Sequence, residues 1–506
     1  MFLKTKKTVH AVISNRWTVF KCPPERIKNL KKIFRYPIPG AEFSQSYRNG
    51  SWDGCKNMLL RGRVSTGLFL ELKSELEKKY LLTIEDQCIF PQFLKKKSES
   101  DRDYQNEALE AMRTNSSCGG LLIAATGAGK TRMAAEFFKS LVGRGLFVVD
   151  ELTLLEQTRL EFEEVIGEKI GIAGRSIFDP QRITVATIQT LSKHCKRKDF
   201  VKWYKTIEVV MIDEIHVAIN RRNINIISQI KPKAVFGLTA TLQLQKPEVR
   251  FPVTALTGPV IFDYAIKTGV EEGFLTQGTV VNLQFQDPMK KPVPGYFTVV
   301  GKDKKKKWIP PWERLAIYRH HISLNKARND MIESLVREGL KRKRRIVVLV
   351  EQRRHLKILT SRFKDVNHRV LSGDKNLSGD PSLRVKAMKD MDAGKVPLIL
   401  ASRVMSKGSN VKSVNVIIDG TALPGDNSAI QRYGRGVRKV DGKHGLLYIN
   451  ISDCGNKLAY ASKLREAALL KTNAHFIHMV WRGDPKEVYE LFERKKGSPR
   501  DPRTHC

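Results

Sequence analysis

The segment "LLIAATGAGKTRM" at residues 121–133 constrains the fold of this chain more than any other. An apolar run leads into a loop with two glycines, and residues typical of a helix follow. Backbone N–H groups of such a loop, together with the amino end of the helix, bind phosphate groups. The pattern therefore predicts an α/β domain with a phosphate site at Lys130 and Thr131.

A second apolar run ends in acidic residues, in "IEVVMIDEIH" at residues 207–216. Carboxylates that follow a parallel strand lie at the sheet edge where ligands bind. We expect ATP as the ligand, with Lys130 at its β and γ phosphates. Thr131 and Asp213 would hold Mg²⁺, and Glu214 would orient or deprotonate the attacking water.

The loop begins with Ala124, where the usual pattern has glycine. Upstream, Gln105 in "RDYQNEAL" has two interpretations that chemistry alone leaves open. Its amide can read adenine through one donated and one accepted hydrogen bond, or it is a surface helix residue. The residues expected to surround the nucleotide are Gln105, Thr126, Gly127, Ala128, Gly129, Lys130, Thr131 and Arg132.

The segment "SAIQRYGRGVRK" at residues 428–439 carries a further candidate site. On a helix, Gln431, Arg435 and Arg438 would share one face. The glycines in between would each cost such a helix about 1 kcal/mol relative to Ala, unless another group approaches the backbone closely. Two guanidiniums on one face suit the negative charge that develops on a transferred phosphoryl group.

Short apolar runs alternate with helical stretches in two series, typical of parallel sheets covered by helices. The predicted fold is α/β, with two doubly wound parallel-sheet domains in tandem after a small α+β domain. The expected ranges are 1–98 for the small domain, 99–256 and 257–480 for the two larger ones, a Pro/Lys-rich insertion near 286–313, and a helix with a basic tail at 481–506.

The formal net charge of +38 indicates a polyanionic partner, most often nucleic acid. Seven cysteines without a CxxC pair argue against a disulfide framework or a zinc site. The N-terminus lacks the apolar stretch of a signal peptide, and no run approaches the ~18 apolar residues that span a bilayer. We therefore expect a soluble, intracellular protein without a membrane partner.

Residues 102–440 resemble a superfamily-two helicase or translocase, through "RDYQ", "ATGAGKT", "VATIQTL", "MIDEIH", "LTATL" and "QRYGRGVR" in the family's order. The resemblance implies two RecA-like domains, adenine contact by Gln105, and an arginine-finger role for Arg435 and Arg438. It also implies that Thr239 and Thr241 couple hydrolysis to movement. The motif "DEIH" is neither DEAD nor DEAH, so it indicates no particular subfamily.

The same resemblance implies that several segments contact the phosphates of one strand, which gives sequence-independent binding. In "SRVMSKGSNV" the acidic residue often found after the glycine is missing, and Asn410 lies near that place. The candidate nucleic-acid contacts in these segments are Thr153, Thr187, Gln189, Ser402 and Lys407.

The N-terminal stretch "SYRNGSWDGCKNMLL" is similar to a segment of phage UvsW-type helicases, which remodel branched DNA and RNA–DNA hybrids. That similarity implies a role in replication, recombination and repair, a monomeric motor and, for a phage protein, the bacterial host's cytoplasm. Arg48, Lys56, Arg61 and Arg63 either contact the phosphates of a second duplex arm or are merely solvated, and the sequence leaves both interpretations open. Trp52 is expected to pack in the small core rather than stack on a base.

Three alternatives remain open. An RNA-specific unwinding ATPase would use the same phosphate contacts. A helicase–nuclease would need Asp53, Glu71 and Lys73 to converge on a metal, which requires a strand where "GLFLELKSELEKK" predicts a helix. A binding or annealing module would carry an inactive ATP site, against which the full set of catalytic candidates argues.

Overall fold

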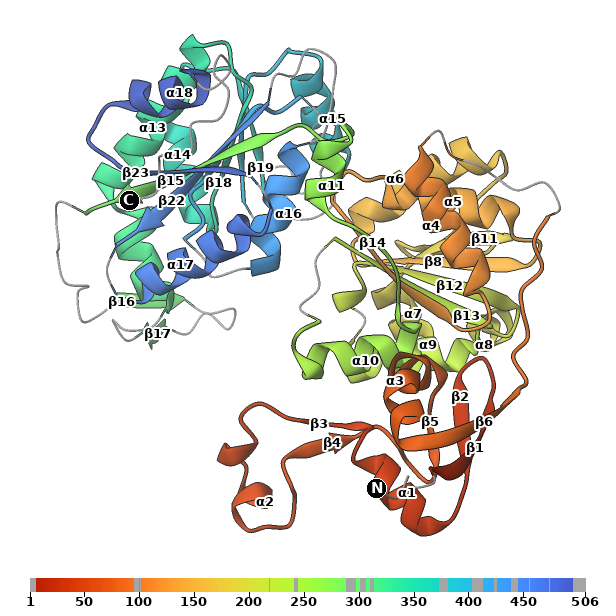
Figure 1. Ribbon diagram of the computed structural model, residues 1–506. Coiled ribbons are helices and arrows are strands. Elements are labelled where there is room, and N and C mark those ends of the chain that lie inside the picture. The colour runs from red at the N-terminus through yellow and green to blue at the C-terminus, as the bar shows by residue number, and fades with distance from the viewer. Residues whose placement is uncertain are drawn as a thin grey trace. The chain divides into compact units, whose positions relative to one another are not determined.

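The computed structural model describes residues 6–94, 100, 102–217, 219–240, 244–287, 297–300, 306–309, 314–372, 381–402, 413–422, 426–437, 445–454, 456–472 and 474–494. The chain divides into two compact units, Met1–Ala265 and Ile266–Cys506. Each unit is built around a large sheet, and the first also contains the small N-terminal domain (Figure 1).

The N-terminal domain is a four-stranded sheet in the order β5-β2-β1-β6, with α1 and α3 packed on one face. A separate hairpin of β3 and β4, which carries α2 between its strands, extends away from this sheet (Figure 1). The elements are β1 (Lys7–Ile13), β2 (Trp17–Lys21), α1 (Pro24–Lys31), β3 (Arg35–Pro37), α2 (Gln45–Arg48), β4 (Cys55–Asn57), β5 (Arg63–Ser65), α3 (Thr66–Lys79) and β6 (Tyr80–Asp86).

The large sheet of the first unit has eight strands in the order β10-β9-β11-β8-β12-β13-β7-β14. All described pairs are parallel except β10 with β9. The strands are β7 (Gly119–Ala124), β8 (Arg144–Val149), β9 (Gly171–Gly174), β10 (Ile177–Asp179), β11 (Ile183–Thr187), β12 (Ile207–Asp213), β13 (Ala234–Thr239) and β14 (Val260–Tyr264).

Helices cover both faces of this sheet, which explains why its strands are continuous apolar runs (Figure 1). The helices α4, α5 and α6 lie on one face and α7 to α10 on the other. Their bounds are α4 (Asp103–Thr114), α5 (Lys130–Ser140), α6 (Leu152–Ile166), α7 (Ile188–His194), α8 (Lys198–Tyr204), α9 (Arg221–Ile230) and α10 (Pro247–Thr257).

The second unit holds an all-parallel sheet of seven strands in the order β19-β20-β18-β21-β22-β15-β23. Its strands are β15 (Gly278–Phe285), β18 (Ile346–Leu349), β19 (His368–Leu371), β20 (Leu398–Ala401), β21 (Val416–Asp419), β22 (Leu446–Asp453) and β23 (His475–Val480). Its helices are α11 (Ile266–Glu271), α12 (Arg314–Ile317), α13 (Lys326–Lys341), α14 (Arg353–Arg362), α15 (Pro381–Asp392), α16 (Asp426–Gly436), α17 (Asn456–Leu470) and α18 (Pro485–Arg494). Residues Tyr318–Ser323 form a π-helix.

Two parallel-sheet domains after a small α+β domain confirm the predicted fold class. The expected boundary between residues 256 and 257 differs from the structure, because β14 pairs with β7 and the units divide after Ala265. The helix α18 was expected in a separate tail, but Val488, Tyr489 and Phe492 belong to the core of the second sheet. The expected insertion contains a described ribbon, β16 (Phe297–Val300) paired with β17 (Lys306–Ile309).

The N-terminal domain packs directly on the first large sheet. Asn15 Nδ2 lies 2.6 Å from Ser117 O and 3.1 Å from Lys233 O, just before β7 and β13 begin. Arg16 donates to Ser228 Oγ on α9 at 3.3 Å. These contacts attach the domain at the amino ends of the parallel strands.

Helix α3 makes a second contact with the large sheet's helices. A Cβ on Gly67 would come within 2.3 Å of Thr254 O, so only glycine allows this approach to α10. Beside it, Arg250 pairs with Glu71 at 3.2 Å, and the rings of Tyr36 and Phe251 lie 5.2 Å apart. The two contacts together make the N-terminal domain and the first large sheet one packed body.

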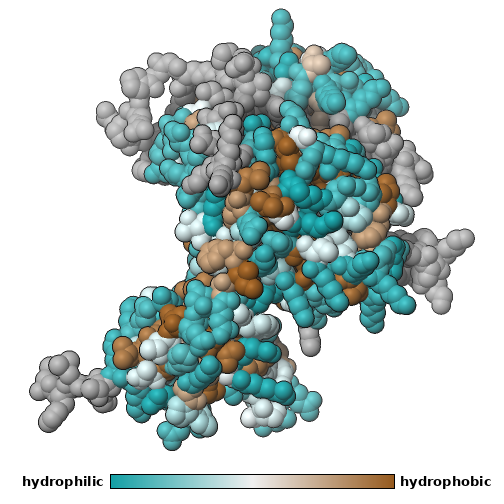
Figure 2. Space-filling view, turned by 90° about the vertical axis from the view of Figure 1, so that its right-hand side faces the viewer, coloured by the Kyte–Doolittle hydropathy of each residue, from teal (hydrophilic) through white to brown (hydrophobic). Residues whose placement is uncertain are grey.

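The face drawn in Figure 2 is mostly hydrophilic, with apolar residues in separate patches rather than one continuous band. Among the described residues, no helix is both long and apolar enough to cross a membrane.

We predict that Gly67→Ala weakens the contact between α3 and α10. The added methyl group must displace backbone, which costs about 1–3 kcal/mol in a packed interior. The thermal midpoint of unfolding should fall, and limited proteolysis should cut between the N-terminal domain and the large sheet. Ser74→Ala, at an exposed position of the same helix, is the control. An unchanged midpoint for Gly67→Ala would contradict this role.

Candidate functional site

Three neighbouring strands bring the predicted catalytic residues to one edge of the first large sheet. In the order β12-β13-β7, Asp213 ends β12, Thr239 ends β13, and β7 leads through the loop to Lys130. The ladder pairs Asp213 with Leu238 and Thr239 with Ile123, so these ends lie level. Residues distant in sequence therefore converge at the carboxyl ends of parallel strands, the usual ligand-binding edge.

The phosphate loop is held by the segment before it. Gln105 is buried and donates from Nε2 to Ala128 O at 2.9 Å, while Ser100 Oγ donates to its Oε1. Gly129 has φ of +83°, and a Cβ there would lie 2.5 Å from Gln105 Nε2. The surface-helix interpretation of Gln105 is therefore wrong, because its amide supports the loop. Contact with adenine stays a prediction.

The described loop residues Thr126, Gly127, Ala128, Thr131 and Arg132 lie around the start of α5. Lys130 Nζ donates to Ala124 O at 3.0 Å, so the ammonium group lies over the loop. Arg132 is exposed and pairs with the buried Glu136 at 3.5 Å. The loop thus presents backbone N–H groups and one cation on the same side as the acidic pair.

Glu214 occupies a strained backbone position beside Asp213. Its φ of +50° is uncommon for a residue other than glycine and marks candidate functional sites. Its Oε2 lies 3.4 Å from His216 Nδ1 and accepts a hydrogen bond from Thr239 Oγ1 at 3.5 Å. Two flanking side chains therefore orient this carboxylate. His216 was not selected from the sequence, although it follows the acidic pair directly in "DEIH".

These residues fit ATP with Mg²⁺. Among the described residues, no group of three or more His, Cys, Asp or Glu side chains gathers to form a metal cage. Mg²⁺ in phosphoryl-transfer sites uses one or two carboxylates and the substrate's phosphates, and keeps several waters. Thr131 and Asp213 offer such a partial set of ligands. Thr241, the second predicted coupling residue, lies outside the described residues.

The helix α16 of the second unit carries Gln431 and Arg435, one turn apart. The helix ends at Gly436, and Arg438 lies outside the described residues, so its predicted place on the same face stays untested. A Cβ on Gly436 would lie 2.5 Å from Leu446 Cδ2. The expected close approach at this glycine is therefore made by the protein's own strand β22.

A buried ion pair that the sequence did not indicate fixes α16 to the sheet. Arg432 Nη2 lies 3.0 Å from Asp419 Oδ2 at the end of β21, and both side chains are almost fully buried. Tyr448 donates a hydrogen bond to the same carboxylate at 2.6 Å. Burial alone would raise the pKa of Asp419, but the guanidiniums of Arg432 and Arg465 bring it down to about 2.

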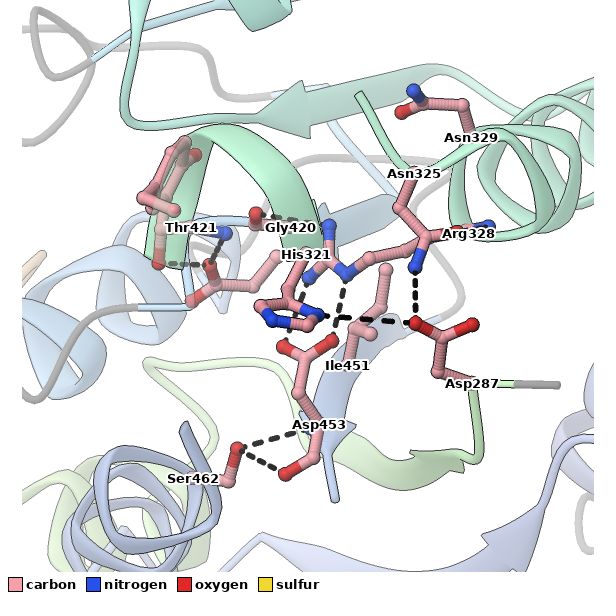
Figure 3. Close-up of polar contacts among 12 residues, drawn as sticks. Asp287, His321, Asn325, Arg328, Asn329, Gly420, Thr421, Ile451, Asp453 and Ser462 are labelled. Atoms are coloured by element: carbon pink, nitrogen blue, oxygen red, sulfur yellow. Dashed lines mark hydrogen bonds and ion pairs between the residues drawn. The ribbon is translucent and has the colours of Figure 1, made fainter. Parts of the chain in front are cut away.

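A second buried pair ties α13 to β22 (Figure 3). Arg328 and Asp453 form two hydrogen bonds, of 2.7 and 3.1 Å, and Arg328 also donates to Gly420 O at 3.4 Å. Asn325 caps α13 and donates to Asp287, which follows β15. Both buried arginine–aspartate pairs thus join a helix to the carboxyl ends of the second sheet's strands.

The predicted strand-contacting segments of the first unit lie beside each other. Gln189 is exposed and donates to Asp150 O at 2.8 Å, which joins the segments after β11 and β8. Thr187 is buried, and its hydroxyl oxygen caps α7 by accepting from Thr190 N. Its side chain is therefore occupied in capping, which argues against direct phosphate contact. Thr153 lies on α6.

In the second unit, Ser402 follows β20 and is mostly buried, and its N–H donates to Leu371 O at 2.9 Å. Lys407 lies outside the described residues. In the N-terminal domain, Arg48 and Lys56 are exposed on the β3–β4 hairpin. Trp52 is half-buried and donates to Cys55 O at 2.9 Å, which supports a packing role.

The structure gives no support to a nuclease site in the N-terminal domain. Glu71 and Lys73 lie on the predicted helix, α3, rather than on a strand. Glu71 pairs with Arg250, and Asp53 pairs with Arg35 at 2.9 Å. The two carboxylates therefore have separate basic partners.

Two known protein families match the regions that contain these candidate residues. Residues 98–244 match the family described as the res subunit of type III restriction enzymes, and residues 327–440 match the helicase conserved C-terminal domain. The chain belongs to the superfamily-two helicases. It is thus a nucleic-acid-dependent ATPase, as the sequence motifs predicted.

Two curated relatives are similar over most of the chain. One is the provisionally named ATP-dependent RNA helicase L396 of Acanthamoeba polyphaga mimivirus, 24% identical over 75% of this chain and 69% of its own length. The other is the DNA 3'-5' translocase XPB2 of Sulfurisphaera tokodaii, 25% identical over 74% of this chain and 85% of its own length. The name of the first relative specifies RNA, and the name of the second specifies DNA.

A solved structure from yeast shares the fold of the two large sheets. S. cerevisiae Dbp5 bound to RNA and ADP BeF3 matches with a TM-score of 0.54 and 12% identity, over 78% of this chain and 93% of that chain. T4 UvsW matches over 94% of this chain and 99% of that chain, with a TM-score of 0.42 and 16% identity.

We predict that Asp419→Asn destabilises the second unit by about 3–5 kcal/mol at neutral pH, because Arg432 is left buried without its counter-charge. The carboxyl's pKa is lowered in the folded state, so its contribution is complete above its ordinary value of about 4. That contribution is lost as the pH falls towards 2. The difference in thermal midpoint between wild type and variant should therefore shrink over this pH range.

The matched control is Asp365→Asn, which breaks the exposed ion pair with Arg337 in the same unit. Its effect on the midpoint should be small, because solvent screens an exposed pair. Equal effects of the two substitutions would show that the buried pair has no special structural role.

Proposed function

We propose that this protein is an ATP-driven DNA helicase or translocase that remodels branched DNA, by branch migration or by processing of forks and R-loops. The observation that carries the proposal is the attachment of a basic N-terminal domain to the first motor sheet. A motor that acts alone needs to bind only the one nucleic-acid strand that it translocates. A second nucleic-acid-binding surface, fixed to the motor, allows a different arm to be held while the first one moves.

The proposed chemistry follows from the residues at the strand ends. ATP supplies the phosphoryl group whose transfer to water drives movement. Lys130 and the loop's N–H groups bind its phosphates, while Thr131 and Asp213 hold Mg²⁺. Glu214, oriented by Thr239 and His216, positions the attacking water and accepts its proton.

From the second unit, Arg435 stabilises the negative charge of the transition state. Arg432 acts as a positioning residue, since its ion pair with Asp419 holds the same helix. Thr239 contacts the catalytic carboxylate directly, which supports its proposed coupling role.

The nucleic acid tracked by the motor is proposed to be DNA. The XPB2 translocase supports DNA by its name, whereas L396 and the RNA-bound Dbp5 structure support the alternative, an RNA-specific unwinder. Phosphate contacts alone do not separate the two, since discrimination depends on the 2′-OH and on helix shape.

Lys130→Ala should abolish nucleic-acid-stimulated ATP hydrolysis and leave DNA binding within about twofold of wild type. The reason is that Lys130 neutralises phosphate charge in the nucleotide and lies in the phosphate loop. The measurements are steady-state phosphate release and equilibrium binding to a tailed duplex without ATP. Lys139→Ala, at an exposed position of the same helix, is a control for local disruption of α5. Undiminished turnover in Lys130→Ala would refute the proposed site.

The rate of ATP-dependent strand separation should be higher on a fork, a four-way junction and an R-loop than on a linear tailed duplex. Arg48→Gln/Lys56→Gln should reduce this preference by several-fold and leave ATPase on single-stranded DNA unchanged, because both residues lie outside the motor. The control is Lys78→Gln/Lys79→Gln on α3, which also removes two positive charges. Equal activity on all four substrates would contradict branched-DNA specialisation, and activity on RNA duplexes alone would favour the alternative.

A further inference from the structure

The sheet of the N-terminal domain has one covered face and one open face. On β2, Thr18 and Phe20 are buried beneath α1 and α3, while Trp17 and Val19 on the opposite face are 45% and 39% exposed. The neighbouring side chain of Lys21 points to the same face by strand alternation. An exposed tryptophan and valine on a sheet in a strongly basic protein require an explanation.

A groove of about 890 Å³ adjoins this open face. We name it the β2–β5 groove. Its walls combine apolar and basic side chains, and its lining residues are Val19, Lys31, Asn57, Leu59, Leu60, Arg61 and Arg63. Leu60 is 65% exposed, so part of the apolar wall is open to solvent.

The turn that leads into β5 presents an arginine in a strained conformation. Leu60 and Arg63 exchange two backbone hydrogen bonds, of 2.9 and 3.0 Å, around a two-residue turn. The two central residues, Arg61 and Gly62, have φ of +50° and +73°. Asn or Gly is the usual residue at both central positions of such a turn. A bulky arginine there suggests that its side chain is kept for function, at some loss of stability.

The next arginine along the turn is paired with the exposed tryptophan. The guanidinium carbon of Arg63 lies 4.8 Å from the centre of the Trp17 ring. The guanidinium lies over one face of the ring, and an aromatic ring beside a positive charge suits a nucleobase and its adjacent phosphate. On the same sheet, the carboxylate of Glu85 pairs with Lys21 at 3.7 Å and with His10 at 3.4 Å.

We propose that the β2–β5 groove binds an unpaired strand of the nucleic-acid substrate. Lys31, Arg61 and Arg63 contact phosphates, and a base stacks on Trp17. The chemistry favours a single strand over a duplex, because stacking needs an exposed base and a duplex exposes base faces only at its ends. This inference rests on the proposed function, and it identifies the nucleic acid that the N-terminal domain binds as the strand displaced at a branch.

Photocrosslinking tests the position of the strand directly. The full chain is mixed with a single-stranded oligonucleotide containing 5-bromouracil, irradiated and digested with trypsin. Cleavage after Arg16 and Lys21 isolates Trp17 in the peptide "WTVFK". The expected result is an adduct on this peptide that disappears when unlabelled single strand is added in excess. Adducts confined to peptides of the two motor sheets would overturn the proposal.

Substitution of Arg61 separates binding from stability. Arg61→Asn removes the charge but suits the turn's backbone, so the thermal midpoint should stay equal or rise while binding weakens. Combined with Lys31→Gln, it should weaken binding to a fork with single-stranded arms about tenfold and reduce the salt slope of log K by about 1.4, since two phosphate contacts are lost. Trp17→Ala should weaken binding by about tenfold without changing that slope.

Two controls are matched to these variants. Lys78→Gln/Lys79→Gln removes two charges from α3, on the covered side of the sheet, and Leu81→Ala removes an exposed apolar side chain from the far edge strand β6. Both should bind as wild type does. Groove variants that bind as well as these controls would overturn the proposal, and so would an equal loss of affinity for blunt duplex and for single strand.

ATPase measurements distinguish failure of this inference from failure of the proposed function. The groove variants should keep the wild-type turnover rate at saturating single-stranded DNA, because the groove lies outside the catalytic residues. Wild-type protein without DNA-stimulated ATPase would refute the proposed motor function itself. Normal ATPase with no adduct and no binding defect would refute only the groove.

Discussion

Parallel pairing of β12, β13 and β7 is the constraint on which the catalytic arrangement depends. The level register of these strands brings the acidic pair, Thr239 and the phosphate loop to one edge, although more than a hundred residues separate the loop from Thr239. Apolar runs on both faces make that register specific, because helices bury each face. The chemistry of the site is thus a consequence of how the core packs.

The second unit positions its candidate catalytic residues in a different way. Its candidate arginine and glutamine project from α16, and the position of that helix relies on a buried charge pair rather than on a strand end. A comparable pair fixes α13 (Figure 3). Buried pairs of this kind are poor general sources of stability, but they disfavour alternative packings in which either charge loses its partner.

Much of this architecture follows from sequence pattern. The two series of apolar runs correspond to five strands in each large sheet, which are β7, β8, β11, β12 and β13 in the first and β18 to β22 in the second. The strands β9, β10, β14, β15 and β23 were missed, because they are short or contain polar residues near sheet edges. The roles of His216 and of the Arg432–Asp419 pair depend on contacts between distant segments, which spacing along a helix or strand does not reveal. The docking of the N-terminal domain was missed for the same reason.

That docking uses the amino ends of the strands, whereas the nucleotide residues occupy their carboxyl ends. The docked domain and the nucleotide residues thus lie at opposite ends of the same strands. The N-terminal domain could nevertheless not be exchanged freely for another domain. A replacement domain would have to supply its own counterparts of Asn15, Arg16 and Gly67. Changes of substrate preference should therefore arise in the exposed face and the hairpin, while the contacts with the large sheet stay unchanged.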